Sequence, residues 1–255
     1  MITIKSEREI KIMRESGRML AHILEYIKKY IKPGISTYEL DLLVEKETLA
    51  IGAKPAYKGY QGFPATICLS VNEEVVHGVP KKDKILKSGD IISCDGGILF
   101  DGYYSDACRT YGVGTISDEA QKLIDATKNS FYEGFNVCKV GNRISDIGNA
   151  VQTYAESLGY NVIRDYVGHG IGMNIHEDPQ IPNYGKKGKG PLLRAGMVIC
   201  VEPMLSIGSY EVETLLDGWT AVTVDNSLSA HYENTIAITE DGPVILTELW
   251  GVYVW

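Results

Sequence analysis

The chain has 255 residues, with 33 acidic and 25 basic side chains and a formal net charge of −8. This length suffices for one large domain or two small ones, and the acidic balance argues against a surface built to bind nucleic-acid phosphates. The first residues hold no apolar run long enough for a signal peptide or a membrane span, and the five cysteines lack C-x-x-C spacing, as expected of reduced thiols in the cytoplasm.

Four helices are predicted, two in each half of the chain. The first begins with a capping box, Ser6 and Glu9, and its apolar residues recur at helical spacing up to Pro33. Glycines and changes of periodicity delimit the others. The four predicted helices cover about residues 6–32, 37–52, 119–137 and 145–159.

Strands are predicted between the helices, where short β-branched runs are bounded by glycine or polar residues. The clearest of them cover residues 67–71, 91–94, 198–201 and 235–239. Each half of the chain is therefore expected to consist of helices packed on an antiparallel sheet, an α+β architecture.

A hairpin turn brings two aspartates together. Asp101 and Gly102, between apolar runs, are typical of a two-residue type I′ turn, and counting back from the turn sets Gly97 opposite Asp106. Asp95 shares a face with Gly97, so the two carboxylates should lie diagonally, about 7–8 Å apart at the backbone. Like charges this close favour a metal site or a carboxylate dyad, although turns commonly contain Asp for structural reasons.

A repeat relates the two halves of the chain. Residues 86–95 and 193–202 have similar sequences 107 residues apart, and each stretch ends in a carboxylate, Asp95 or Glu202. A His-x-x-Pro motif also precedes each carboxylate. Because such polar groups are costly to bury unpaired, we expect a shared polar site between the halves. This predicts a single domain over residues 1–255, with related halves of about 1–115 and 116–255.

Further candidates stand at strand ends or among glycines. Glu202 ends an apolar run before a proline, Glu233 opens another, and His169 lies in Gly168-His-Gly-Ile-Gly172. A lone glutamate at a strand end is usually exposed and without function. The glycine-rich segment lacks the spacing and the following helix of a dinucleotide-binding loop.

Together these residues resemble the type 1 methionine aminopeptidases, and the resemblance extends over about residues 4–241. It implies the pita-bread fold, in which two pseudo-symmetric α/β halves surround a dinuclear metal site, and it thereby accounts for the repeat. Seven residues match the family in order and context: His77, Asp95, Asp106, His169, His176, Glu202 and Glu233.

The resemblance also implies roles for these residues. Two divalent ions, Co, Mn, Fe or Zn, would be bound by oxygen and nitrogen ligands, a set that suits all four metals. The implied ligands are Asp95, Asp106, His169, Glu202 and Glu233. The implied catalytic residues are Glu202, which would also transfer protons, His176, which would stabilise the oxyanion, and His77, which would contact the scissile amide.

The implied substrate pocket is apolar and suits a methionine side chain. Its residues would be Tyr57, Tyr60, Phe63, Cys68, His77, Ile175, His176 and Trp219. Tyr57 and Ile175 depart from the types common in the family, which are a smaller residue and an aromatic respectively. A monovalent cation is implied near Asn72, Glu74 and Ser229.

The implied activity is removal of the initiator methionine from nascent proteins when the second residue is small, by a cytoplasmic monomer whose partners are nascent N-termini and the ribosome. An X-Pro aminopeptidase or prolidase is one alternative, although those relatives usually carry an extra N-terminal domain and the matched unit here starts almost at Met1. The short spacing of Glu202 and Glu233, 31 residues, leaves no room for the insertion of type 2 methionine aminopeptidases. A metal-free binding module is the other alternative, and the presence of all five ligands counts against it.

Overall fold

Four α-helices and fifteen strands form the part of the chain, residues 1–249, that the computed structural model describes. Residues 250–255 of the predicted domain lie outside this part. The helices are α1 (Glu7–Lys28), α2 (Thr37–Ala50), α3 (Asp118–Asn136) and α4 (Ile144–Ser157), with a short 3-10 helix η1 (Tyr60–Gly62). The strands are β1 (Lys54–Pro55), β2 (Cys68–Val71), β3 (Glu74–Val76), β4 (Ile91–Phe100), β5 (Tyr103–Gly112), β6 (Asn161–Val162), β7 (Gly168–Gly170), β8 (Glu177–Ile181), β9 (Val198–Val201), β10 (Met204–Ser206), β11 (Val212–Thr214), β12 (Ala221–Thr223), β13 (Ser229–His231), β14 (Glu233–Thr239) and β15 (Gly242–Ile245).

The four predicted helices are confirmed, with shifts at their ends. Ser6 accepts a hydrogen bond from the Glu9 backbone, and the Glu9 carboxylate accepts one from the Ser6 backbone, so the capping box is formed. Helix α1 stops at Lys28, four residues before the predicted end. The apolar pattern continues beyond it because Tyr30 and Ile31 pack on the core from the following turn.

The central sheet has nine strands and runs through both halves of the chain. Its strand order is β1-β4-β5-β14-β9-β7-β8, while β2 also pairs with β4 and β15 with β14. All these pairings are antiparallel. The antiparallel strands expected in each half are present, and they join in one sheet because β5 of the first half pairs directly with β14 of the second.

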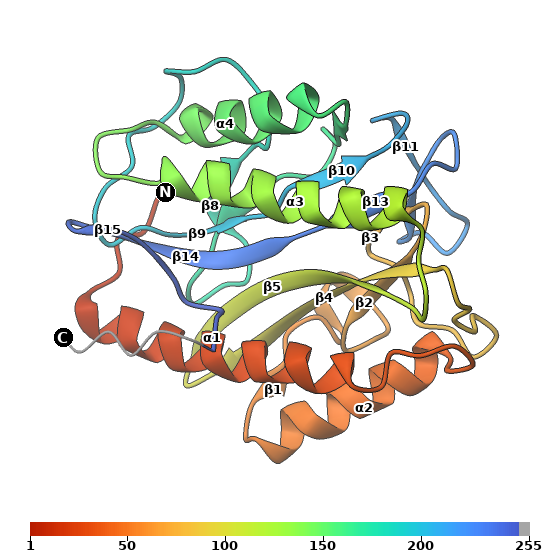
Figure 1. The fold of residues 1–255 in the computed structure, drawn as a ribbon. Coiled ribbons are helices and arrows are strands. Elements are labelled where there is room, and N and C mark those ends of the chain that lie inside the picture. The colour runs from red at the N-terminus through yellow and green to blue at the C-terminus, as the bar shows by residue number, and fades with distance from the viewer. Residues whose placement is uncertain (250–255) are drawn as a thin grey trace.

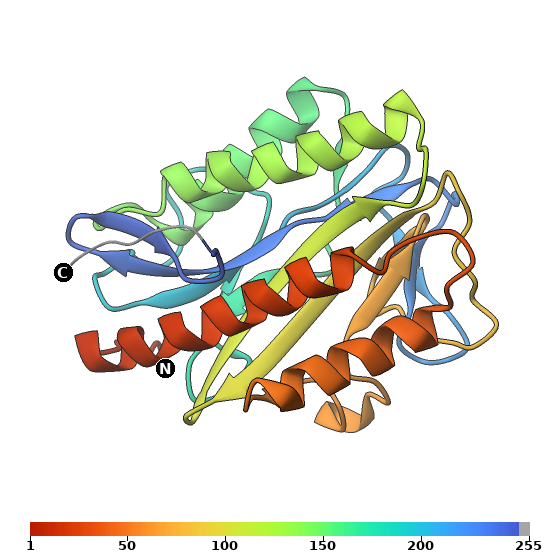
Figure 2. The same cartoon turned by 60° about the horizontal axis from the view of Figure 1, so that its bottom comes forward.

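The helices cover the sheet in two pairs (Figures 1 and 2). Helices α1 and α2 pack with β2 and β4 of the first half around a core that includes Leu24, Leu40 and Ile92. On the second half, α3 and α4 enclose a core with β9 and β14 that includes Phe131 and Ile147. The helices bury one face of the sheet in these cores, and the carboxylates lie on strand segments that line a pocket.

The predicted hairpin is confirmed residue by residue. Asp101 and Gly102 have φ values of 46° and 82°, as a type I′ turn requires. Asp106 lies opposite Gly97, and Asp95 lies opposite Cys108. The turn has therefore set the register that places the two aspartates on one face of the sheet.

The repeat appears in the structure as matched local contacts. Ser36 forms a β-bridge with Ile85, and 107 residues later Arg143 forms one with Leu192. Helices α2 and α4 begin directly after Ser36 and Arg143 and have the same length. The same local unit, a bridge followed by a helix, is thus formed twice.

Two small sheets flank the central one, with orders β13-β10-β6 and β11-β12-β3. The five cysteines are free and buried, as predicted. None of the helices within residues 1–249 is both long and apolar enough to cross a membrane.

Candidate active site

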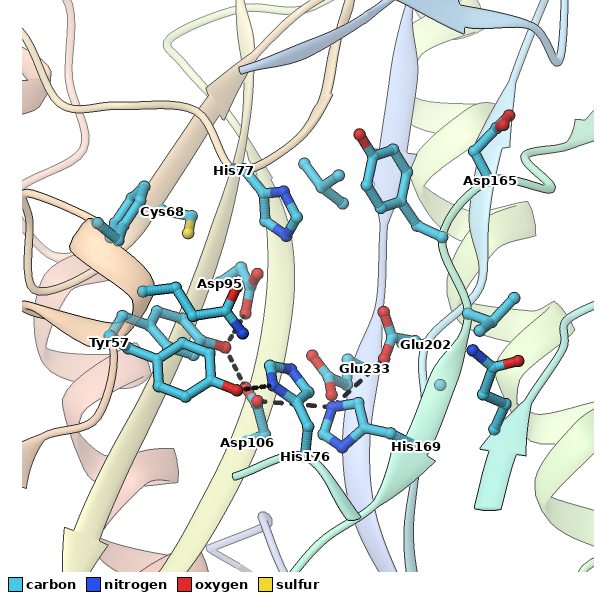
Figure 3. A pocket seen from close by; sticks show the side chains of 18 of the residues that line it. Tyr57, Cys68, His77, Asp95, Asp106, Asp165, His169, His176, Glu202 and Glu233 are labelled. Carbon is cyan, nitrogen blue, oxygen red and sulfur yellow. Dashed lines mark hydrogen bonds and ion pairs between the residues drawn. The ribbon is translucent and has the colours of Figure 1, made fainter. Parts of the chain in front are cut away.

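A cavity of about 680 Å³ opens between the two halves of the sheet (Figure 3). Strands of both halves and the loops that follow them supply its walls. It is lined by all seven residues on which the sequence prediction centred: His77, Asp95, Asp106, His169, His176, Glu202 and Glu233.

Carboxylates from three neighbouring strands meet at the bottom of this cavity. Asp95 lies on β4, Asp106 on β5 and Glu233 at the start of β14, and one oxygen of each lies within 4.8 Å of the others. Glu202 follows β9, and its Oε1 lies 3.7 Å from Nε2 of His169. The same His169 nitrogen lies 3.9 Å from Asp106 Oδ2. All five predicted ligands therefore face one small volume.

The electrostatics of this volume call for a cation. Burial raises the pKa of the Asp95 carboxyl to about 7, despite an opposing hydrogen bond from Tyr57. Burial and the neighbouring carboxylates raise the pKa values of Asp106, Glu202 and Glu233 well above their ordinary range. The described residues that line the cavity include no Lys or Arg, and Glu233 Oε1 is buried without a hydrogen-bond partner. A divalent metal would neutralise these groups, so the residues fit one.

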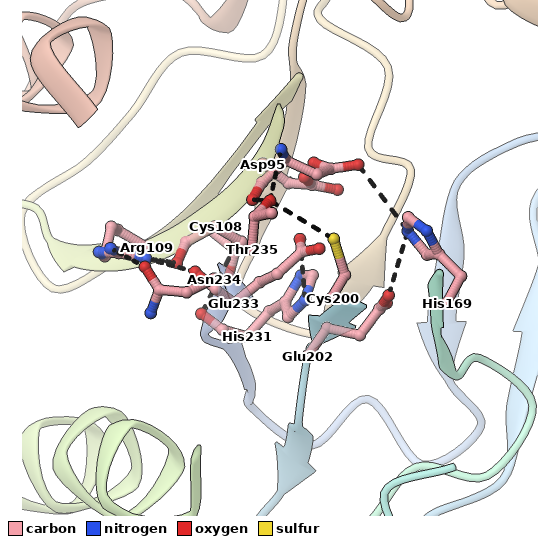
Figure 4. A network of polar contacts seen from close by, with 12 residues as sticks. Asp95, Cys108, Arg109, His169, Cys200, Glu202, His231, Glu233, Asn234 and Thr235 are labelled. Carbon is pink, nitrogen blue, oxygen red and sulfur yellow. Dashed lines mark hydrogen bonds and ion pairs between the residues drawn. The ribbon is translucent and has the colours of Figure 1, made fainter. Parts of the chain in front are cut away.

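The contact between β5 and β14 holds two of these carboxylates in place (Figure 4). Thr235 Oγ1 donates to the Asp106 carbonyl at 2.8 Å and accepts from the Asp106 amide at 3.0 Å. Arg109 donates to the carbonyl of Glu233 and, at 2.6 Å, to Oδ1 of Asn234. Side chains thus bridge the two strands where the halves meet.

His169 is positioned by glycine and by its own backbone. A Cβ on Gly168 would lie 2.2 Å from the Cys200 carbonyl oxygen, so only glycine lets β7 approach β9 here. Nδ1 of His169 contacts the Gly170 carbonyl at 2.9 Å, which leaves Nε2 facing the carboxylates. Burial and the neighbouring His176 lower the pKa of His169 to about 4, and the neutral imidazole is the form that binds metal.

His77 faces the same cavity from the end of β3. Its φ of 57° is unusual for a residue with a side chain, and such conformations concentrate at functional sites. Its ring lies edge-on to Tyr166 with ring centroids 5.2 Å apart. The next residue is Gly78. A Cβ at this position would lie 2.4 Å from the Leu69 carbonyl oxygen, so only glycine fits there. Burial lowers the pKa of His77 to about 4.

The loop that carries His176 is held by the N-terminal segment. Nδ1 of His176 and the Tyr60 hydroxyl lie 2.9 Å apart. The adjacent Glu177 accepts from Lys5 at 2.7 Å and from Thr3 at 2.5 Å, and its other oxygen accepts from the Asn174 amide at 3.2 Å. The side chains of Lys5 and Glu177 are only 5% and 8% exposed.

An apolar wall lies beside the carboxylates. Phe63 and Trp219 pack edge to face with centroids 5.3 Å apart, and Cys68 joins their cluster. Trp219 is fixed by Asp217, whose carboxylate accepts from its amide at 3.0 Å. Ile175, also predicted for the pocket, is buried and is not among the described residues that line the cavity.

Some site residues escaped the sequence prediction. The sulfur of Cys200 lies within 4.8 Å of a ring nitrogen of His169 and a carboxylate oxygen of Glu233. It stands two residues before Glu202, so the two-residue period of a strand was a usable signal. His231 is buried with both ring nitrogens unpartnered, and Nε2 lies 4.0 Å from a Glu233 oxygen.

Comparisons with known proteins agree with this geometry. Residues 11–240 match the model of metallopeptidase family M24. The methionine aminopeptidase 1 of Bacillus subtilis is 53% identical over 98% of this chain and 100% of its own length, and a methionine aminopeptidase of Clostridium acetobutylicum is 52% identical over 97% and 99%.

Solved structures agree as well. The crystal structure of methionine aminopeptidase from Thermotoga maritima superposes with a TM-score of 0.96 at 47% identity, covering 97% of this chain and all of that one. A prolidase from Pyrococcus furiosus shares the fold at 24% identity, with a TM-score of 0.79 over 97% of this chain and 66% of its own. The pita-bread fold expected from the resemblance is therefore confirmed, and the chain belongs to metallopeptidase family M24.

Proposed function

We propose that this chain is a methionine aminopeptidase, which removes the N-terminal methionine of new proteins when the second residue is small. The observation that carries the proposal is the cluster of three buried carboxylates, the partly buried Glu202 and His169 beside an apolar wall. Identities of 52–53% to methionine aminopeptidases over almost their whole length support it.

Two divalent ions are proposed for the cluster. Asp95, Asp106, His169, Glu202 and Glu233 would hold them. When bound, the ions supply the positive charge that makes a water molecule nucleophilic near neutral pH. The oxygen and nitrogen donors suit Co, Mn, Fe and Zn.

The chain's own residues would handle the protons and the peptide. Glu202 would accept a proton from the attacking water and deliver it to the leaving amine. When the Tyr60 hydroxyl donates to Nδ1 of His176, Nε2 of His176 carries the ring proton. Nε2 can then donate to the carbonyl oxygen of the scissile peptide bond as negative charge develops there. His77, on the opposite wall, would contact the scissile amide.

The methionine side chain would lie against the apolar wall. Phe63, Cys68 and Trp219 form its surface, and Tyr57 and Tyr60 also line the cavity. Ile175 would support the pocket indirectly, since it packs with Tyr57 beside Gly97. A thioether suits this mixture of aromatic and sulfur groups. A bulky second residue would be excluded if the cleft is crowded where that residue binds.

A monovalent cation is proposed near Asn72, Glu74 and Ser229. The Ser229 amide donates to the Asn72 carbonyl at 2.9 Å, which brings these segments together. The Glu74 carboxylate already pairs with Lys84, so main-chain carbonyls would be the ligands.

The cellular setting is proposed to be the cytoplasm. The protein would act there as a monomer with a single domain, and its partners would be nascent chains and the ribosome.

The test is the release of free amino acid from Met-Ala-Ser, Leu-Ala-Ser and Ala-Pro-Ser, after chelation and after restoring Mn, Co or Fe. Metal-dependent release from Met-Ala-Ser above both controls is the expected result. Preference for Ala-Pro-Ser would indicate an X-Pro aminopeptidase, and no release from any peptide with any metal would indicate a binding module.

Replacing His77 separates catalysis from metal binding. In His77→Ala we expect turnover to fall about 100-fold, the size of effect that loss of one positioned hydrogen-bonding group has in other enzymes, with metal content unchanged because His77 is not a proposed ligand. Steady-state kinetics and metal analysis measure the two quantities. His22→Ala is the control, since this histidine is half exposed on α1 and pairs with Glu47. Full turnover in His77→Ala would refute the assigned role.

A further inference from the structure

The hydroxyl of Tyr57 lies on the carboxylates of the metal cluster and not only in the apolar wall (Figure 3). It donates to Asp95 Oδ1 at 2.9 Å and also bonds Oδ1 of Asp106. Among residues 1–249, no other side chain is hydrogen bonded to either carboxylate group. The sequence prediction placed Tyr57 only among the residues that contact the methionine side chain.

The ring of Tyr57 is held where it must be for this contact. A Cβ on Gly97 would lie 3.1 Å from Cε1 of Tyr57 and 3.2 Å from Cδ1 of Ile175, so the missing side chain of Gly97 leaves the space that the ring and Ile175 fill. Phe63 packs perpendicular to the ring with centroids 6.5 Å apart. The hydroxyl cannot leave the carboxylates without repacking these neighbours.

Gly97 is also the residue opposite Asp106 in the β4–β5 hairpin. The hairpin register that brings Asp95 and Asp106 to one face therefore also opens the gap between them to the ring. The glycine at this position of β4 therefore leaves room for the ring beside the carboxylate pair.

A phenol in this position has a definite chemical effect. It donates a hydrogen bond to a carboxylate oxygen and stays neutral itself, so it orients the group and offsets part of the repulsion between two acids. Groups that hydrogen-bond metal-binding side chains in this way fix the orientation of the ligands and tune the affinity of the site.

We propose that the Tyr57 hydroxyl is a positioning group for the metal centre, which orients Asp95 and Asp106 for a divalent ion. This inference rests on the proposed function, because it takes the two aspartates as metal ligands. It assigns to Tyr57 a role in metal affinity that is separate from any contact with the substrate.

The experiment compares Tyr57→Phe with wild type in a competition titration of Co²⁺ against a chelating dye. Phe keeps the ring between Gly97 and Ile175 and removes only the hydroxyl. We expect Co²⁺ to bind about 10–100-fold more weakly, the range found when such hydrogen-bond partners of metal ligands are removed. The visible absorption of bound Co²⁺ should change as well, since it reports the arrangement of the ligands.

Tyr60→Phe is the matched control. It removes a hydroxyl from the same cavity, but one that contacts His176 and not a proposed ligand, so its affinity for Co²⁺ should equal that of wild type. Circular dichroism of the metal-free variants checks the fold. Should Tyr57→Phe not fold, Tyr57→Leu, which also lacks the hydroxyl, must show the weaker binding.

The outcomes separate this inference from the proposed function. Equal or tighter binding of Co²⁺ by Tyr57→Phe, or an equal loss in Tyr60→Phe, would overturn the inference while metal-dependent methionine release by wild type still stands. Failure of the wild-type protein to bind Co²⁺ would overturn both.

Discussion

Asp106→Asn should sharply reduce metal loading and the rate of methionine release together. Asp106 lies at the centre of the cluster, with Oδ2 3.9 Å from Nε2 of His169 and a carboxylate oxygen within 4.8 Å of oxygens of Asp95 and Glu233. An amide keeps the shape of the side chain, but it is neutral and has one oxygen where the carboxylate, a proposed metal ligand, has two charged ones. If about 4 kcal/mol of the stabilisation that metal ions supply is lost, release of methionine slows about a thousand-fold.

Metal analysis after dialysis and the rate of release from Met-Ala-Ser measure this prediction. Asp101→Asn is the matched control, because it makes the same chemical change at the exposed turn of the same hairpin, where Asn is equally suited to the type I′ conformation. Retention of both metal and activity in Asp106→Asn would show that this carboxylate is not a ligand.

Lys5→Met should lower the free energy of unfolding by about 3–5 kcal/mol, the usual effect of leaving one member of a buried ion pair without its partner. Burial by itself raises the pKa of Glu177, but the hydrogen bonds from Lys5 and Thr3 outweigh it, so the pKa lies below its ordinary value of 4.5. In wild type this stabilisation is present above pH 4.5 and disappears as the pH falls through the lowered pKa. The difference in free energy of unfolding between wild type and Lys5→Met should therefore become smaller below about pH 4.5.

Chemical denaturation at pH 7 and pH 4 measures this difference. Lys58→Met is the control, because Lys58 and Glu45 form an exposed pair that should contribute less than about 1 kcal/mol. The double variant Lys5→Met, Glu177→Gln should recover part of the loss, since no charge is then buried alone. A change within 1 kcal/mol for Lys5→Met would show that the N-terminal segment does not stabilise the loop of His176.

Local signals predicted much of the fold. The Asp101-Gly102 turn determines the register of its hairpin, so the placement of Asp95 and Asp106 followed from counting residues. The capping box at Ser6 located the start of α1 for the same reason, because both partners lie within one turn. Where the interaction is local, its geometry can be read from spacing.

Long-range features could not be predicted in this way. The pairing of β5 with β14 joins Cys108 to Glu233, and no turn or motif links these distant strands. The contact of Tyr57 with the aspartates depends on the space beside Gly97, which exists only once the sheet has formed. Such features needed the assembled structure.

The junction between β5 and β14 also bears on the order of events in synthesis. Asp106 leaves the ribosome well before Glu233, and the first half can form its hairpin while Glu233, the last of the proposed ligands, is still untranslated. If the proposed ligands hold a metal, tight binding has to wait until β14 pairs with β5. The bound metal would then stabilise the pairing of the two halves by mass action, because it would bind the folded chain and not the unfolded one.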